Sequence, residues 1–191
     1  KATELGCKNT NFLNANGLPE TYHYTTAYDM ALITKWALQQ NGFRAVWGAK
    51  NYSMPADNVK PTNYNVRTHN NMILENDDYY DSRITGGKLG WTEEAMHTMV
   101  STAEKDGLEI IIVVMFSEHW YEKFIDISAL CNYAFNNFNS ASILSFSFFK
   151  FLNDLTALRR SANILLTKGA LSTLRKPIYP RESNVLFTVL Y

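Results

Sequence analysis

The strongest hydrophobic pattern along the chain lies between residues 84 and 116, where three apolar runs follow one another. They extend from Ile84 to Thr92, from Met96 to Ala103 and from Leu108 to Phe116, and each has the length and composition of a β-strand. The sequence Lys105-Asp106-Gly107 between the last two runs is a signal for a tight hairpin turn. The pattern therefore predicts three consecutive strands of an antiparallel sheet.

Two stretches with helical periodicity lie on either side of these strands. The first runs from about Ala27 to Gln40, can be capped by Thr25 or Thr26, and is ended by Gly42. The second runs from about Ser117 to Phe138. Its large apolar residues fall on one stripe: Trp120, Phe124, Ile127, Cys131, Phe135 and Phe138. A stripe of this kind predicts a helix that covers one face of the sheet.

The other parts of the first 138 residues are predicted to be short or irregular elements. Lys1 to Gly6 is expected to be a short helical tail that Gly6 ends in the left-handed conformation, and Asn9 to Pro19 is expected to be loop. Residues 51–65 contain Pro55 and Pro61 and are expected to be irregular.

The character of the sequence changes after Asn139. Short apolar runs at Ile164 to Leu166 and Val185 to Leu190 are separated by glycine and prolines, a pattern typical of β structure. We therefore predict an α+β chain with two units, residues 1–138 and an incomplete, β-rich C-terminal domain at residues 139–191. The chain ends inside a strand pattern, which we interpret as a truncation.

Composition and charge exclude several classes of function. Lys plus Arg and Asp plus Glu both number 18, so the chain lacks the positive charge expected of a nucleic-acid-binding protein. The four histidines match no metal-ligand spacing, so no metal site is predicted. Cys7 and Cys131 are expected to be buried free thiols. No apolar run approaches the ~20 residues that a membrane-spanning helix needs.

Four strings along the chain carry a family resemblance. They are Leu5-Gly6-Cys7-Lys8-Asn9-Thr10-Asn11-Phe12, Asn14-Ala15-Asn16-Gly17-Leu18, His23-Tyr24-Thr25-Thr26-Ala27-Tyr28-Asp29-Met30-Ala31 and Gly86-Gly87-Lys88-Leu89-Gly90-Trp91-Thr92. In order and spacing, the chain resembles the C-terminal half of the catalytic domain of serine-type D-alanyl-D-alanine carboxypeptidases, which are low-molecular-mass penicillin-binding proteins with a β-lactamase-like or transpeptidase-like fold. The resemblance covers residues 1–138 and extends weakly over residues 161–182.

The family has three active-site elements, S-x-x-K, S-x-N and K-T-G, which together activate a serine nucleophile and hold the substrate. The resemblance implies that Lys88 is the catalytic cation of the third element. It also implies that Leu89, Gly90, Trp91 and Thr92 line the substrate site, with the backbone N–H of Trp91 as an oxyanion-hole donor.

Two departures from the family pattern stand in or beside this third element. Leu89 replaces the hydroxyl residue that would bind the substrate carboxylate, and its isobutyl group would crowd the cleft if it pointed inward. Met96 stands where the family usually has glycine.

The nucleophilic serine is expected to be absent from this chain. Ser147-Phe148-Phe149-Lys150 and Ser161-Ala162-Asn163 fit S-x-x-K and S-x-N, but they follow Lys88, whereas the family places both elements before it. Ser147 and Lys150 also lie in an alternating pattern that would point them to opposite faces of a strand. We therefore expect neither string to be functional and the chain alone to be inactive.

The resemblance implies an enzyme that removes the terminal D-alanine from peptidoglycan stem peptides ending in D-Ala-D-Ala, with β-lactams as covalent inhibitors of the complete enzyme. No cofactor and no nucleic-acid partner are implied. The expected location is extracytoplasmic, in the cell envelope, with membrane association only through parts outside this chain. Two alternatives stay open: a β-lactamase-related serine hydrolase, and a non-catalytic peptidoglycan-binding or degenerate fragment.

Overall fold

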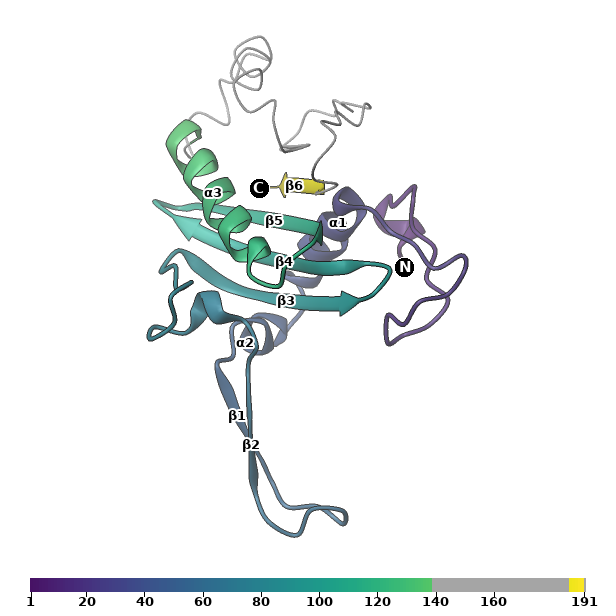
Figure 1. The fold of residues 1–191 in the computed structure, drawn as a ribbon, viewed down its shortest axis with the longest axis vertical. Coiled ribbons are helices and arrows are strands. Elements are labelled where there is room, and N and C mark those ends of the chain that lie inside the picture. The colour runs from purple at the N-terminus through teal and green to yellow at the C-terminus, as the bar shows by residue number, and fades with distance from the viewer. Residues whose placement is uncertain (139–185, 191) are drawn as a thin grey trace.

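The structure is a computed structural model that describes residues 1–138 and the strand at residues 186–190. Four strands form an antiparallel sheet in the order β3-β4-β5-β6 (Figure 1). They are β3 (Ile84–Thr92), β4 (Met96–Lys105), β5 (Leu108–Ser117) and β6 (Leu186–Leu190). The three predicted strands are thus confirmed, and the α+β class with them.

The predicted turn between β4 and β5 has the conformation that its sequence requires. Lys105 pairs with Leu108, so the loop has only two residues, Asp106 and Gly107. Both have positive φ angles, 52° and 76°, as a type I′ turn demands.

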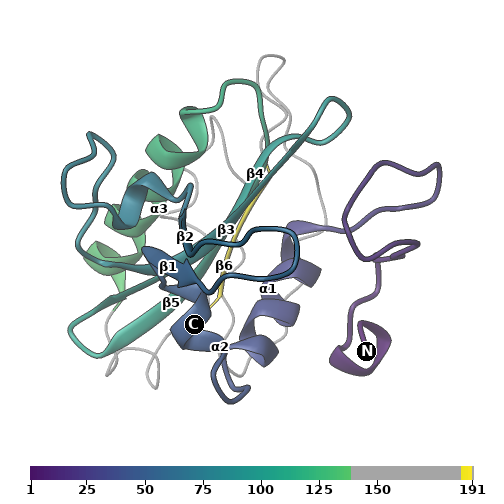
Figure 2. The ribbon, with the colours of Figure 1, turned by 90° about the horizontal axis from the view of Figure 1, so that it is seen from below.

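Helices cover both faces of the sheet. Figure 2 shows α3 (Glu122–Asn137) on one side of the strands and α1 (Ala27–Ala37) on the other. Side chains of β5 alternate between the two resulting cores: Ile110 and Ile112 pack on the α3 side, and Ile111 and Val113 pack on the α1 side. Because β5 is buried on both faces, its sequence is a nearly continuous apolar run.

The first helix begins where its cap predicts. The side chain of Thr26 accepts a hydrogen bond from the Asp29 N–H at 3.2 Å. The Asp29 carboxylate is itself buried and accepts hydrogen bonds from the Asn9 N–H at 2.8 Å and the Thr10 hydroxyl at 2.7 Å. Asp29 therefore lies in the first turn of α1 and also links the N-terminal segment to that helix by hydrogen bonds.

The second helix begins later than its apolar stripe predicted. Ser117 still belongs to β5, and α3 starts at Glu122. The Glu122 carboxylate accepts a hydrogen bond from the His119 N–H, which closes the turn before the helix. Trp120 therefore lies outside α3 and is 52% exposed, so its place on the helical stripe that covers the sheet was wrong, whereas Phe124, Ile127, Cys131 and Phe138 are buried.

Residues 51–67 are more regular than the prolines suggested. β1 (Asn51–Met54) and β2 (Tyr64–Arg67) pair as an antiparallel hairpin that extends from the body as an arm (Figure 1). The short helix α2 (Phe43–Trp47) precedes it, and a 3₁₀ turn, η2 (Asn71–Ile73), follows it. The expectation of an irregular segment was therefore wrong for the two strands.

Several smaller predictions are confirmed. Thr3–Leu5 forms a 3₁₀ turn, η1, that ends at Gly6 with a φ of 84°. Cys7 and Cys131 are free and buried. Apart from these confirmed predictions, apolar helices of membrane-spanning length are absent from the described part of the chain, a finding that concerns those residues alone.

The domain division at residue 139 stays a prediction, because residues 139–185 lie outside the described part. The apolar run at its end does form a strand, β6, which pairs with the middle of β5.

Candidate peptide-binding strand

The strand β3 carries all five residues predicted for the substrate site. Within the described residues β3 has one neighbour, β4, and its other edge is open. Lys88, Gly90 and Trp91 are exposed on it, and Leu89 and Thr92 are partly buried. An open edge presents unpaired backbone N–H and C=O groups, which can bind an extended peptide.

Lys88 and Leu89 lie on opposite faces of the sheet. Lys88 pairs with Val100, which belongs to the α1-side core, whereas Leu89 pairs with Met99 of the α3-side core. Leu89 itself packs against the α3-side core. The isobutyl group therefore does not crowd the face on which Lys88 lies. The Lys88 ammonium donates a hydrogen bond to the carbonyl of Leu89.

Two glycines before Lys88 allow close approach of neighbouring groups. A Cβ on Gly86 would lie 2.4 Å from Trp47 Cδ1 and 2.6 Å from the Trp47 carbonyl oxygen. A Cβ on Gly87 would lie 2.8 Å from the Val100 carbonyl oxygen. Gly86 and Gly87 thus have a packing role, which the family motif alone did not predict.

Trp47 holds α2 against the sheet through a buried hydroxyl. Its indole N–H donates to the Thr102 hydroxyl at 2.8 Å, and the Thr102 and Thr85 hydroxyls are 2.7 Å apart. These contacts surround an irregularity in the β3–β4 register between Ile84 and Gly86. They fix the start of β3, and hence the direction in which the strand presents Lys88. Sequence reasoning missed Trp47, because only the packing reveals its role.

The end of β3 leads directly into the turn toward β4. The Thr92 hydroxyl accepts a hydrogen bond from the Ala95 N–H at 3.0 Å, so Thr92 begins that turn. Met96 follows with a φ of 53°. A left-handed backbone favours glycine, which explains physically why the family pattern has glycine at this position.

Aromatic side chains form a second constellation beside the strand. Trp91 lies 6.0 Å from the ring of His97, and His119 stacks on Tyr121 at 5.6 Å. Trp120 connects Tyr121 to Tyr79, with ring centroids 5.9 and 5.8 Å away. We call these six residues the aromatic belt: Trp91, His97, His119, Tyr121, Trp120 and Tyr79.

Burial lowers the pKa of one side chain beneath the belt and of one within it. Lys123 is buried, and desolvation lowers its pKa to about 8. Its ammonium donates to the Trp120 carbonyl and lies 4.4 Å from the centre of the Phe124 ring. Burial, followed by the nearby positive charges of Lys123 and His119, lowers the pKa of His97 below its usual value.

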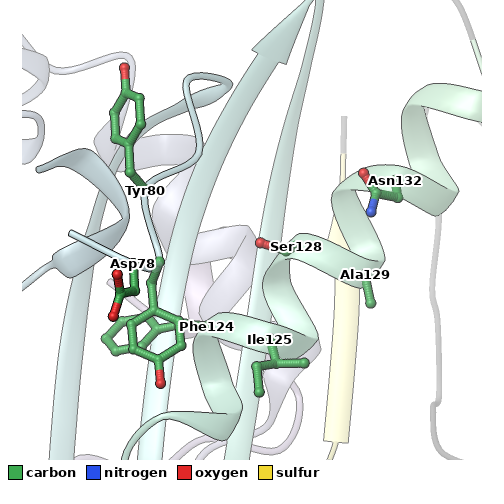
Figure 3. Close-up of a pocket in the computed structure, with 8 residues that line it drawn as sticks. Asp78, Tyr80, Phe124, Ile125, Ser128, Ala129 and Asn132 are labelled. Carbon is green, nitrogen blue, oxygen red and sulfur yellow. The ribbon is translucent and has the colours of Figure 1, made fainter. Parts of the chain in front are cut away.

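A pocket of about 480 Å³ lies at one end of the belt, between α3 and the segment that precedes β3 (Figure 3). Tyr79 and Phe124 contribute aromatic lining, and their rings are 5.1 Å apart. Asp78, Ser128 and Asn132 contribute polar groups. The Ser128 hydroxyl points from α3 toward the segment that carries Asp78 (Figure 3). Lys88 does not line this pocket.

Metal chemistry has no support in the described residues, which contain no cluster of three or more His, Cys, Asp or Glu side chains able to hold an ion. The strings at Ser147 and Ser161 lie outside the part of the chain that the structure describes.

Comparisons with known proteins show the family of this chain. The family model for D-alanyl-D-alanine carboxypeptidase matches residues 1–118. The chain therefore belongs to the D-alanyl-D-alanine carboxypeptidase family.

Two curated relatives cover most of the same region. The chain is 31% identical to the D-alanyl-D-alanine carboxypeptidase DacF of Bacillus subtilis over 140 residues, which are 73% of the chain and 34% of the relative. It is 25% identical to DacA of Haemophilus influenzae over 143 residues, 74% of the chain and 34% of that protein. The chain thus spans about a third of the length of the curated relatives that it matches.

Solved structures show the same fold. The DD-transpeptidase of Streptomyces K15 superposes with a TM-score of 0.64 at 26% identity, covering 71% of this chain and 51% of the transpeptidase. A D-alanyl-D-alanine carboxypeptidase of Mycobacterium tuberculosis superposes with a TM-score of 0.62 at 21% identity, covering 73% and 51% of the two chains. The second likeness concerns the fold alone.

Proposed function

We propose that this chain is part of a serine D-Ala-D-Ala carboxypeptidase of the cell envelope, which trims peptidoglycan stem peptides at the outer face of the cytoplasmic membrane. The observation that carries the proposal is the open edge of β3 with Lys88 exposed on it, in a chain of this family. In this proposal the stem peptide pairs with the β3 edge by backbone hydrogen bonds.

Each group on β3 has a part in the proposed chemistry. The Lys88 ammonium attracts the terminal carboxylate of the substrate. The Trp91 N–H donates to the carbonyl oxygen of the penultimate D-alanine as that oxygen becomes negative, an effect worth about 3 kcal/mol of barrier for one donor. Gly90 has no side chain to keep the peptide from the backbone.

The acylating serine would come from an S-x-x-K element, and no such string precedes Lys88 in residues 1–191. Its hydroxyl oxygen would bond to the penultimate carbonyl carbon and release D-alanine as the peptide bond breaks. Water would then hydrolyse the ester and restore the serine. β-Lactams would acylate the same serine and inhibit the enzyme.

A chimera with a relative tests this proposal. The segment of B. subtilis DacF that matches this chain is replaced by the corresponding residues of the chain, so that the relative supplies the serine. Covalent labelling by a fluorescent penicillin and release of D-alanine from a D-Ala-D-Ala peptide are then measured. Lys88→Ala should slow both by about a hundredfold, whereas Lys105→Ala, an exposed lysine at the far turn, should slow neither. Equal rates for the two variants would contradict the proposed role of β3.

A non-catalytic peptidoglycan-binding protein is the second candidate, because Leu89 offers no hydroxyl and packs against the core. Restoring the hydroxyl distinguishes the two. If the chimera with Leu89 binds muropeptide without being acylated, and only its Leu89→Thr variant is acylated, the binding protein is favoured. If both forms turn over the peptide, the enzyme is favoured. Faster hydrolysis of penicillin than of the peptide would instead favour a β-lactamase.

A further inference from the structure

The aromatic belt exposes more apolar surface than folding alone explains. Trp91 is 62% exposed, Trp120 is 52% exposed, and Tyr121 is 36% exposed. Ring contacts join Trp91 to His97 and, in a second group, join His119, Tyr121, Trp120 and Tyr79, so these side chains form two clusters rather than scattered residues. Exposed patches of this kind mark binding surfaces.

The pocket at the end of the belt supplies polar groups with free bonding capacity. Among the described residues, neither the Asp78 carboxylate nor the Ser128 hydroxyl makes a hydrogen bond or ion pair. Asn132 accepts a hydrogen bond from Arg83 through its Oδ1 atom at 2.8 Å, which leaves its amide N–H groups free. A carboxylate, a hydroxyl and an amide donor thus line the same pocket as aromatic rings, the usual composition of a small-ligand site.

The charge and the side-chain types of this surface indicate which class of ligand it can bind. No belt residue is Lys or Arg, Lys123 beneath it is buried, and Asp78 adds a negative charge, so nucleic acids and anionic lipids are disfavoured. A pyranose ring has one face of C–H groups that packs on an indole or phenol ring, and hydroxyl and acetamido groups that need both donors and acceptors. The belt and its pocket offer these groups together.

The position of the belt also suits a sugar chain. If a stem peptide pairs antiparallel with β3, its N-terminal end runs toward Trp91. Trp91 lies three positions after Lys88, about 10 Å along a strand, whereas a five-residue stem can span about 17 Å. The sugar to which the stem is attached would therefore lie beyond Trp91, beside the belt.

We propose that the aromatic belt and the pocket lined by Asp78, Ser128 and Asn132 bind the glycan strand of peptidoglycan. This proposal deepens the proposed function and rests on it for the identity of the polymer.

The test uses the 191-residue chain and peptidoglycan glycan strands from which all stem peptides have been removed, with binding followed by tryptophan fluorescence and calorimetry. Saturable binding is expected, weakened about fivefold or more by Trp91→Ala and also weakened by Asp78→Asn, an exposed position whose replacement leaves the core intact. Tyr22→Ala, which removes an exposed tyrosine outside the belt, should leave the affinity unchanged, and so should Lys88→Ala.

Two results would overturn the glycan site: the absence of saturable binding, or binding that Trp91→Ala and Asp78→Asn leave unchanged. Preferential binding to anionic lipid vesicles or capture of a protein with no affinity for glycan would overturn it as well. Because the probe contains no peptide and the readout involves no acylation, these results are separate from a failure of the carboxypeptidase proposal. That proposal is decided by the Lys88 variants of the chimera.

Discussion

The close contact between Gly86 and Trp47 leads to a sharp prediction about stability. Gly86 has a negative φ, so alanine fits its backbone conformation, and the cost of Gly86→Ala is purely steric. The new Cβ would lie 2.4 Å from Trp47 Cδ1 and 2.6 Å from the Trp47 carbonyl oxygen. Rotation of the indole relieves only the first contact, so the backbone of α2 must move away from β3.

The expected loss of stability follows from these contacts. Overpacking in a tight core costs about 1–3 kcal/mol, and displacement of Trp47 breaks its 2.8 Å hydrogen bond to Thr102, worth about 1 kcal/mol more. We expect Gly86→Ala to lower the free energy of unfolding by about 3 kcal/mol, or the melting temperature by about 6–12 °C. Trp47→Ala in the same chain should not restore the loss, because the carbonyl contact remains.

Gly90→Ala is the matched control on the same strand. Its Cβ would meet only the Thr98 hydroxyl at 2.8 Å, the end of a side chain that can rotate away. The expected change is within about 1 kcal/mol, because alanine also restricts the unfolded chain. Urea unfolding and calorimetry of the purified chain measure both variants. Equal melting temperatures would refute the claim that Trp47 holds the start of β3.

Further predictions concern two buried charges and the chain as a whole. Asp29→Ala should destabilise the chain by about 1–3 kcal/mol, because it removes the part-buried hydrogen bonds from the Asn9 N–H and the Thr10 hydroxyl, and hydrogen exchange should show lost protection at Asn9 first; unchanged protection there would contradict this role. Burial lowers the pKa of Lys123 to about 8 from 10.5, so the folded state binds fewer protons than the unfolded state between these values. Stability should therefore rise by up to about 3 kcal/mol from pH 8 to pH 10.5, and Lys123→Met should abolish that rise in urea titrations. The isolated 191-residue chain should form no covalent adduct with a fluorescent penicillin on a denaturing gel; a labelled band would show that it contains a working serine.

The sheet and its helices could be predicted because their sequences contain local signals. Alternation and continuous apolar runs indicated β3 to β5, and the Asp-Gly pair indicated the turn. Thr25 or Thr26 indicated the start of α1, and the structure shows that Thr26 is the cap. The aromatic stripe indicated α3 but placed its start too early. Trp120 has the spacing of a residue on the helix, although its backbone belongs to the preceding turn.

The hairpin of β1 and β2 was missed although its sequence alternates on both sides. Asn51-Tyr52-Ser53-Met54 and Tyr64-Asn65-Val66-Arg67 each place polar and apolar residues in turn. The proline-containing loop between them obscured the pairing, and the strands are mostly exposed, so no core pattern marked them.

The candidate site could be located from sequence only as far as its motif. The string at residues 86–92 placed Lys88 on a strand, but the face occupied by Leu89 depends on the β3–β4 register, which no local pattern specifies. The belt was equally hidden, because Trp91, Trp120 and Tyr79 belong to separate elements that come together only in the folded chain.

The arm of β1 and β2 behaves as an independent appendage. Its base is closed by a hydrogen bond from the Thr68 N–H to the Lys50 carbonyl at 2.9 Å, so the chain leaves and re-enters the body at nearly the same point. Loops with adjoining ends can be shortened or lengthened with little entropic cost to the rest of a domain. The arm is therefore a natural place to insert a reporter or an affinity tag without disturbing β3, and a protease that cuts its tip would leave two fragments held together by the pairing of β1 with β2 and by the packing of α1 and α2 against the sheet.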